Sequence, residues 1–171
     1  MKRCLEIVLL ATGLSLFCTA SFRFIERWAV EAQPQLAKLF RPQLKIVGRL
    51  EIPRLDIDVL VIEGDEQDAL SLAAEHLAGT AAFGAGNTVI AAHRDAELRH
   101  LRRICIGDRL RVRAAKTYIY VVKRIQVVPA SDITALRQAA TPVLTLVTCY
   151  PFRYVGDAPE RFIVQAELAG S

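Results

Sequence analysis

An uncharged apolar run directly follows a basic start at the beginning of the chain. Lys2 and Arg3 open the sequence, Glu6 interrupts it, and Ile7 to Phe22 then contains no charged residue. Such a run is short for a transmembrane helix, which needs about 20 apolar residues, but flanking side chains that snorkel can extend it. The basic pair favours a cytoplasmic start and an exported body. We therefore expect an N-terminal membrane anchor over residues 1–24.

A cleaved signal peptide is the alternative to an anchor. Cys18-Thr19-Ala20 offers only a weak cleavage site of the small-x-small kind, so an uncleaved anchor is favoured. After it, residues 25–45 mix apolar and polar positions, with Pro34 and Pro42 as breaks. We interpret this segment as a membrane-proximal stalk.

From residue 46 onward the pattern changes to short segments rich in β-branched and apolar residues. The expected strands are Ile46–Ile52, Ile57–Ile62, Thr88–Ala92, Arg109–Arg113, Tyr118–Val128, Val143–Thr148 and Phe162–Leu168. About seven strands with only short helices between them predict a closed or nearly closed β-barrel. The fold class is therefore mainly β, and the barrel domain is expected over residues 46–171.

Three short helical segments are expected between the strands. Apolar residues follow helical spacing over 66–77, with Asp65 as a plausible N-cap and Gly79 as a C-cap. Residues 96–104 predict a short helix or turn. Ser131 could cap one helical turn over 132–137.

Composition and charge exclude several classes of protein. The chain is 53% hydrophobic with a mean hydropathy of +0.28, both high for a soluble domain because of the apolar N-terminus. The net charge is +4, but Lys and Arg are interleaved with Asp and Glu. A nucleic-acid-binding protein more often gathers its basic residues on one face, so no nucleic acid is expected as partner. The four cysteines form no C-x-x-C pair and no zinc-site spacing, so no metal is expected.

Cys149 stands where an expected strand ends, two residues before Pro151. A thiol at a strand end is held by a rigid element and can still face a cleft. Its nucleophilic form is the thiolate, which a nearby cation stabilises. A small buried hydrophobic residue is the alternative interpretation, and the position alone does not exclude it.

His93 and Arg161 occupy comparable positions. His93 follows an expected strand and could act as a general acid–base, although a structural histidine bound to Asp95 or to a carbonyl is the alternative. Arg161 begins the strand after the cysteine loop, and antiparallel pairing of the two strands would bring it beside Cys149. Its guanidinium could hold a carbonyl or a developing oxyanion. Arg153, within the loop, is the rival cation.

Together these residues resemble the sortase family. The segment Thr145-Leu146-Val147-Thr148-Cys149 matches the T-L-x-T-C signature of that family. Further segments similar to class D sortases are Ile52–Leu55, Gly86–Ala91, His93–Asp95, Leu101-Arg102, Gly107-Asp108, Thr148–Phe152, Gly156, Ala158-Pro159 and Arg161–Val164. The resemblance extends from Gly48 to Leu168, which is nearly the whole expected barrel domain.

The resemblance implies an eight-stranded sortase-type β-barrel outside the bacterial cytoplasmic membrane, held by a single-pass N-terminal anchor. It implies a cysteine transpeptidase that cleaves an L-P-x-T-G-like C-terminal sorting signal after its threonine and keeps the acyl group as a thioester. An amine of a peptidoglycan precursor or a pilin lysine then takes the acyl group. No metal or organic cofactor is implied.

The same resemblance assigns roles to individual residues. Cys149 is the nucleophile, His93 is the acid–base, and Arg161 donates hydrogen bonds to the substrate or the oxyanion. The residues implied in substrate binding are Thr148, His76, Asp95 and Tyr150. His76 and His100 are the alternative bases.

Two other functions are compatible with the sequence. An exported hydrolytic cysteine peptidase would use the same residues with water as the acceptor. A non-catalytic exported β-barrel that binds peptide predicts a buried and unreactive Cys149. Metal binding through His93, Asp95 and Cys149 lacks the ligand spacing of known sites.

Overall fold

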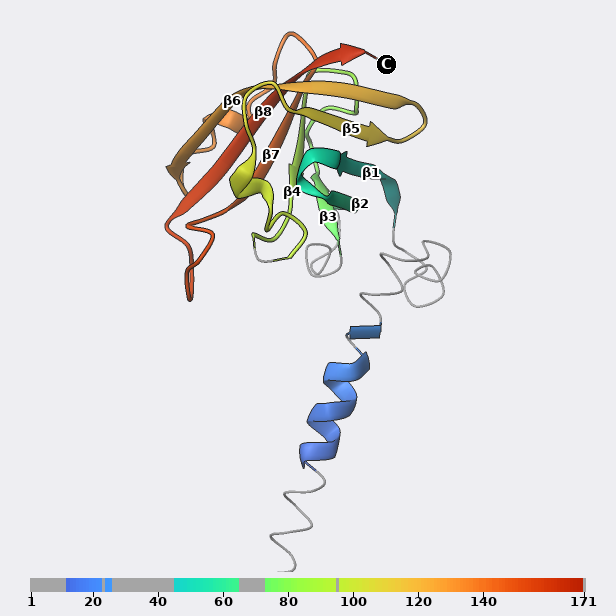
Figure 1. The fold of residues 1–171 in the computed structure, drawn as a ribbon, viewed down its shortest axis with the longest axis vertical. Coiled ribbons are helices and arrows are strands. Elements are labelled where there is room, and N and C mark those ends of the chain that lie inside the picture. Colours follow the sequence, from blue (N-terminus) through green and yellow to red (C-terminus); the bar gives the residue numbers. More distant parts are fainter. Residues whose placement is uncertain (1–11, 23, 26–44, 65–72, 95, 171) are drawn as a thin grey trace, which may run out of the picture. The chain divides into compact units, whose positions relative to one another are not determined.

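The computed structural model describes residues 12–22, 24–25, 45–64, 73–94 and 96–170 (Figure 1). The chain divides into two compact units, Met1–Gln43 and Leu44–Ser171. In the first unit, the described residues are helical. None of the described helices is both long enough and apolar enough to cross a membrane. Half of the expected anchor and nearly all of the expected stalk fall outside the described residues, and both stay predictions.

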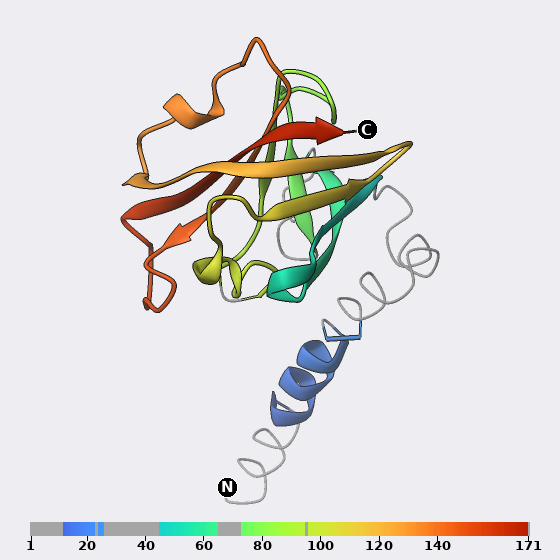
Figure 2. The same cartoon turned by 45° about the horizontal axis from the view of Figure 1, so that its top comes forward.

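In the second unit, eight strands of the described residues form a closed barrel (Figures 1 and 2). The strands are β1 (Ile46–Ile52), β2 (Ile57–Gly64), β3 (Ala74–Leu77), β4 (Asn87–Ala91), β5 (Arg109–Arg113), β6 (Thr117–Pro129), β7 (Val143–Tyr150) and β8 (Glu160–Gly170). Their order around the barrel is β1-β2-β3-β4-β7-β8-β6-β5. The pairs β2–β3 and β4–β7 are parallel, and the other neighbours are antiparallel. The predicted closed β-barrel is therefore confirmed.

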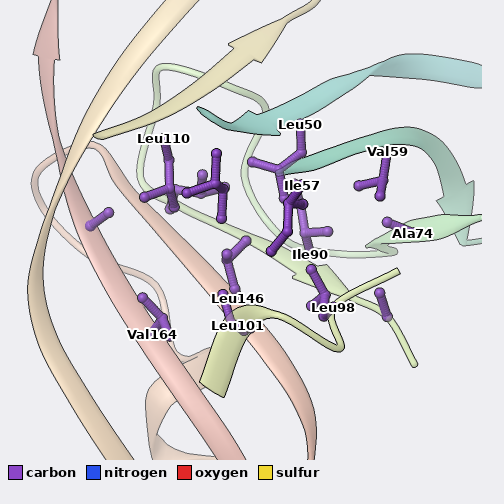
Figure 3. Close-up of a cluster of buried hydrophobic side chains, with 14 of the residues drawn as sticks. Leu50, Ile57, Val59, Ala74, Ile90, Leu98, Leu101, Leu110, Leu146 and Val164 are labelled. Atoms are coloured by element: carbon purple, nitrogen blue, oxygen red, sulfur yellow. The ribbon is translucent and has the colours of Figure 1, made fainter. Parts of the chain in front are cut away.

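The barrel interior is filled by aliphatic side chains from different strands. Figure 3 shows Leu50 of β1, Ile90 of β4 and Leu146 of β7 in one cluster. Leu110 of β5 and Val164 of β8 belong to the same cluster, and all five side chains are fully buried. The barrel therefore has a continuous apolar core. Each buried side chain of this size stabilises the fold by about 1.5–3 kcal/mol.

The direction of the core fixes which residues face outward. Successive side chains of a strand point to opposite faces of the sheet. Because Leu146 of β7 lies in the core, Val147 and Cys149 point away from it. Because Ile90 of β4 lies in the core, Ala91 points to the same outer face. The outer face of β4 and β7 is therefore where Cys149 can meet a ligand.

The helix predicted over 66–77 is wrong where the structure describes that segment. Ala74–Leu77 form β3, which pairs in parallel with β2 and antiparallel with β4; residues 65–72 lie outside the described part. Ala74 and His76 are buried while Glu75 and Leu77 are half-buried, which is strand alternation rather than helical spacing. Pairing on both edges overrides the helical preference of this short sequence. β3 ends at Leu77, and Gly79 lies in the turn that follows it, with φ of 77°.

The two shorter segments predicted as helical turns do contain 3-10 helices. Residues 96–104 do form turns followed by the 3-10 helix η3 (Leu101–Arg103). The turn expected over 132–137 is the 3-10 helix η4 (Thr134–Leu136). Its N-cap is Ile133, without a side-chain cap bond, so the cap predicted at Ser131 is wrong. In the turn before η4, the Asp132 carboxylate accepts a hydrogen bond from the Thr134 N–H at 2.8 Å. Hydrogen bonds from Thr134, first from its side chain and then from its backbone N–H, hold the pKa of Asp132 below its usual range.

Asp108 ties the start of β5 to the 3-10 helix η1 (Pro53–Leu55). Its carboxylate accepts from Arg54 Nε at 2.6 Å and from the Cys105 N–H at 2.8 Å. The hydrogen bond from Arg54 holds the pKa of Asp108 below its usual value. A carboxylate with a lowered folded pKa stabilises the fold above its unfolded pKa of about 3.9. That contribution is lost as the pH falls through the folded pKa.

We expect Asp108→Asn to lower the free energy of unfolding by about 1–2 kcal/mol at pH 7, because the variant loses its charge interaction with Arg54. Solvent screening of this surface network limits the size of the effect. The difference from wild type should narrow below about pH 4. Urea unfolding at several pH values measures it. Asp58→Asn, which removes the exposed partner of Arg49, is the control and should have a smaller effect. A difference for Asp108→Asn that is the same at pH 7 and pH 3 would contradict the expectation.

Candidate active site

Cys149 lies near the end of β7, directly opposite Arg161 on β8. The two strands are antiparallel, and the register pairs Cys149 with Arg161. Side chains of directly opposed residues lie on one face of the sheet, with their Cβ atoms about 4.5–5.5 Å apart. The prediction that strand pairing brings Arg161 beside Cys149 is therefore confirmed. Both residues are half-buried, and the thiol is free.

His93 reaches the same place from β4. β4 and β7 run in parallel, and the register pairs Ala91 with Val147. Just beyond this pair, the Ala92 N–H donates to the Val147 carbonyl at 3.2 Å, and the Thr148 hydroxyl donates to the Ala92 carbonyl at 2.7 Å. His93 follows at once and is exposed. The two strand ends are thus bonded to each other immediately before His93 and Cys149.

A pocket of about 300 Å³ opens at this end of the barrel. The described residues that line it are His93, Arg94, Cys149, Gly156, Asp157, Ala158 and Arg161. The structure therefore brings together all three residues that the sequence predicts to be catalytic. The Cys149 thiol thus shares this pocket with an imidazole and two guanidinium groups.

Arg161 is oriented by the backbone next to it. Its Nη1 donates to the Ala158 carbonyl at 3.0 Å and to the Glu160 carbonyl at 2.9 Å. A guanidinium has five N–H donors. The two hydrogens of Nη1 hold the side chain in place, so Nε and Nη2 remain the groups that can donate to a carbonyl or an oxyanion in the pocket.

Arg94 is a pocket residue that the sequence analysis did not select. Its Nη2 donates to the Tyr154 carbonyl at 2.8 Å and lies 3.5 Å from the Gly156 carbonyl. Gly156, Asp157 and Ala158, in the loop between β7 and β8, were also not selected as site residues. The available signal was position: Arg94 directly follows His93, and the other three lie between Cys149 and Arg161.

The described residues that were predicted to bind substrate do not line this pocket. Thr148 is buried, and its hydroxyl holds the Ala92 carbonyl. Tyr150 packs against Phe162, with ring centres 6.2 Å apart. Neither is among the described pocket-lining residues, and Asp95 lies outside the described part of the chain. A substrate contact by these residues stays a prediction, but Thr148 has a visible positioning role.

His76 is held inside the end of the barrel rather than at the pocket. It is 8% exposed, its Nδ1 lies 3.2 Å from a Glu63 carboxylate oxygen, and its Nε2 lies 3.1 Å from the Ala81 carbonyl. His100, the other alternative base, has its Nδ1 3.0 Å from the Leu55 carbonyl. Neither histidine is among the described residues that line the pocket, so the geometry favours His93 as the acid–base.

The pocket geometry also bears on two alternatives from the sequence: Arg153 in place of Arg161, and a metal site. Arg153 is exposed and is not among the described residues that line the pocket. Within the described residues, no group of His, Cys, Asp and Glu side chains is arranged to hold a metal ion. The site that the structure presents is a thiol with a histidine and two arginines.

The barrel and this site have counterparts in known proteins. The sequence model of the sortase domain matches residues 50–169. The chain belongs to the sortase family. Its members are cysteine transpeptidases, and the match includes every described residue of the pocket.

Individual relatives agree with this assignment. The chain is 31% identical over 129 residues to sortase D of Bacillus subtilis (strain 168), covering 73% of this chain and 65% of that protein. The chain thus spans slightly less than two thirds of that relative. Sortase D5 of Clostridium perfringens superposes with a TM-score of 0.67 at 24% identity, covering 83% of this chain and 92% of that one. Sortase C-1 of Streptococcus pneumoniae gives a TM-score of 0.66 at 26% identity, covering 74% and 68%.

Proposed function

We propose that this sortase is a membrane-anchored transpeptidase that cleaves an L-P-x-T-G-like C-terminal sorting signal and transfers the protein to an amine. One observation carries the proposal: Cys149, His93 and Arg161 line one pocket, although they come from the ends of three different strands. Such convergence of a thiol, an imidazole and a guanidinium suits acyl transfer, which needs a nucleophile, a proton carrier and an oxyanion donor.

In the first half-reaction, the Cys149 thiolate attacks the carbonyl carbon of the threonine–glycine bond. The carbonyl oxygen becomes an oxyanion, to which Arg161 donates hydrogen bonds. The C–N bond then breaks, and His93, as imidazolium, gives its proton to the leaving amine. The product is a thioester between the threonine acyl group and Cys149, and His93 is left neutral.

In the second half-reaction, an amine attacks the thioester carbonyl. Neutral His93 takes the proton of that amine, and Arg161 again stabilises the oxyanion. The C–S bond breaks, the new amide leaves, and the thiolate and imidazolium are restored. Water in place of the amine would give hydrolysis with the same residues.

The outer face of β4 and β7 supports a peptide path toward Cys149. Ala91 and Val147 are paired neighbours on this face, and both are half-buried. An extended peptide advances about 3.3 Å per residue. A segment that places its scissile carbonyl at Cys149 would therefore lay its preceding residues over this apolar floor, which suits the leucine and proline of the signal.

The acceptor amine and the location are parts of the same proposal. A peptidoglycan precursor or a pilin lysine would supply the amine outside the cytoplasmic membrane. The basic start and the uncharged run from Ile7 to Phe22 support a single-pass anchor with an exported barrel. Fractionation of cells that produce the full chain or a chain lacking residues 1–24 tests the anchor: recovery of both in the soluble fraction would exclude it.

The direct test incubates the full-length chain with a library of L-P-x-T-G-type peptides and a small amine, followed by mass spectrometry. A thioacyl adduct on Cys149 that passes to the amine is the expected result. An adduct that only water resolves, at every amine tested, would instead make the protein a hydrolytic peptidase. No adduct together with a Cys149 that iodoacetamide does not label would exclude a cysteine enzyme and favour a peptide-binding barrel.

Arg161→Ala is expected to lower kcat by about 10²- to 10³-fold, as loss of one oxyanion donor does in other acyl transferases. KM for the peptide should change less, because the lost contact strengthens in the transition state. Arg153→Ala, which removes an exposed arginine from the loop between β7 and β8, is the matched control. Full turnover in Arg161→Ala with loss in Arg153→Ala would assign the donor to the other arginine.

A further inference from the structure

Arg94 bridges two walls of the Cys149 pocket. It lies directly after His93, and its guanidinium reaches the loop between β7 and β8 (residues 151–159). There Nη2 donates to the Tyr154 carbonyl at 2.8 Å and lies 3.5 Å from the Gly156 carbonyl. The guanidinium carbon also lies 6.0 Å from the centre of the Tyr154 ring. One side chain therefore joins the segment that carries His93 to this loop.

The loop that Arg94 contacts forms the opposite wall of the pocket. Gly156 and Ala158 both line the pocket, and the Ala158 carbonyl accepts the hydrogen bond from Arg161 Nη1. A continuous set of contacts thus runs from Arg94 through the loop to Arg161. If the loop moved away from β4, the carbonyl that orients Arg161 would move with it.

The tip of this loop has little packing of its own. Val155 is 98% exposed and Tyr154 is 48% exposed. Segments with few buried contacts open at low free-energy cost. Charge-assisted hydrogen bonds are stronger than neutral ones. The hydrogen bonds from Arg94 therefore contribute more to holding the tip in place than its few packing contacts do.

Resting on the proposed transpeptidase function, we propose that Arg94 is a positioning residue. It holds the β7–β8 loop against the end of β4. It thereby keeps His93 and Arg161 in the positions on either side of Cys149 that acyl transfer requires. A planar guanidinium suits this task, because it can donate to two carbonyls and lie against a ring at once. A lysine ammonium could reach one of those carbonyls, but it could not donate to both and lie flat against the ring.

The first test measures the loop itself and needs no substrate. In the full-length chain, Arg94→Ala should speed chymotrypsin cleavage after Tyr154 by about tenfold, the factor that corresponds to the loss of one charge-assisted bond. Labelling of Cys149 by a bulky maleimide, relative to iodoacetamide, should rise in parallel. Peptide mass spectrometry separates Cys149 from the other thiols. Both reagents are neutral, so loss of the Arg94 charge does not itself favour one of them.

The second test measures turnover of an L-P-x-T-G-type peptide. Arg94→Ala should lower kcat by about tenfold and leave KM within about threefold, because transition-state geometry rather than binding is disturbed. Arg94→Lys should fall between wild type and Arg94→Ala. A residue that merely stabilised the fold would lower the unfolding temperature and would not separate kcat from KM.

Two further variants isolate the cause. Arg99→Ala removes an exposed arginine five positions along the same segment, and it should behave as wild type in every assay. Gly156→Ala loosens the loop without changing a charge, because Gly156 has φ of 91° and a Cβ disfavours that conformation. It should reproduce the labelling and kcat changes of Arg94→Ala, and the double variant should be little worse than either.

The outcomes are distinguishable from failure of the proposed function. Wild-type rates of cleavage and labelling in Arg94→Ala would overturn the inference, even if turnover were lost. A loosened loop with unchanged kcat would also overturn it, since Arg94 would then hold the loop without positioning anything. If wild type turned over no peptide, the substrate proposal would fail, and the cleavage and labelling results alone would decide the role of Arg94.

Discussion

Replacing Cys149 with alanine is expected to remove turnover of the sorting-signal peptide, with a fall of at least about 10⁴-fold in kcat. No second thiol or hydroxyl is available in this pocket to form the acyl intermediate: the other described residues that line it are a histidine, two arginines, a glycine, an aspartate and an alanine. The thioacyl adduct seen by mass spectrometry should disappear with the thiol. Steady-state turnover and the intact mass after incubation with peptide measure the two effects.

The fold should tolerate this change. Cys149 is half-buried on the outer face, so Cys149→Ala removes one sulfur atom from a site outside the aliphatic core. Cys105→Ala, which removes an exposed thiol elsewhere in the barrel, is the control and should keep full activity. An adduct that survives in Cys149→Ala and vanishes in Cys105→Ala would place the chemistry at the wrong cysteine.

His93→Ala is expected to lower kcat by about 10²- to 10⁴-fold, the range for loss of a general acid–base. The physical reason is the leaving group: an amine cannot depart as an anion and must receive a proton. With a peptide thioester as substrate, whose thiolate leaves without a proton, the acylation defect should shrink markedly. Comparing single-turnover acylation of the amide and the thioester measures this difference.

His100→Ala is the matched control for His93→Ala. His100 is partly buried and lies against the Leu55 carbonyl, so its loss should leave kcat within about threefold of wild type. An equal loss with amide and thioester substrates in His93→Ala would show that the residue does not protonate the leaving amine. Loss of turnover in His100→Ala alone would move the acid–base role to that residue.

How much of the barrel the sequence could predict depended on strand length. Arg109–Arg113 alternates arginine with buried aliphatics, and the predicted bounds equal those of β5. Ala74–Leu77 was missed because four residues without β-branched side chains carry almost no strand signal. Its state is set by β2 and β4 on either side, and such pairing with distant segments cannot be read from local spacing.

In the candidate site, too, residues placed by local structure could be predicted from the local sequence, whereas residues placed by long-range pairing could not. That Arg161 lies beside Cys149 follows from a local hairpin, and sequence order alone was enough to predict it. Placing His93 there depended on the family resemblance, because a parallel pairing of β4 with β7 joins segments more than 50 residues apart. Arg94 was missed because its acceptors are backbone carbonyls, which no side-chain pattern marks. Its contact with Tyr154 spans 60 positions.

The direct pairing of Cys149 with Arg161 has a consequence for insertions and deletions. The loop of residues 151–159 can change length while the two strands keep their register, since long loops are tolerated at low free-energy cost. A single residue removed from β8 just after Arg161 acts differently, because a slip of one position sends alternate side chains to the opposite face. Arg161 would then occupy the position opposite Thr148, on the face that points to the apolar interior, and Glu160 would lie opposite the thiol. Evolution and protein engineering can therefore vary the length of the loop where its contacts with Arg94 and Arg161 are kept, whereas the strands on either side of it must keep their residue count.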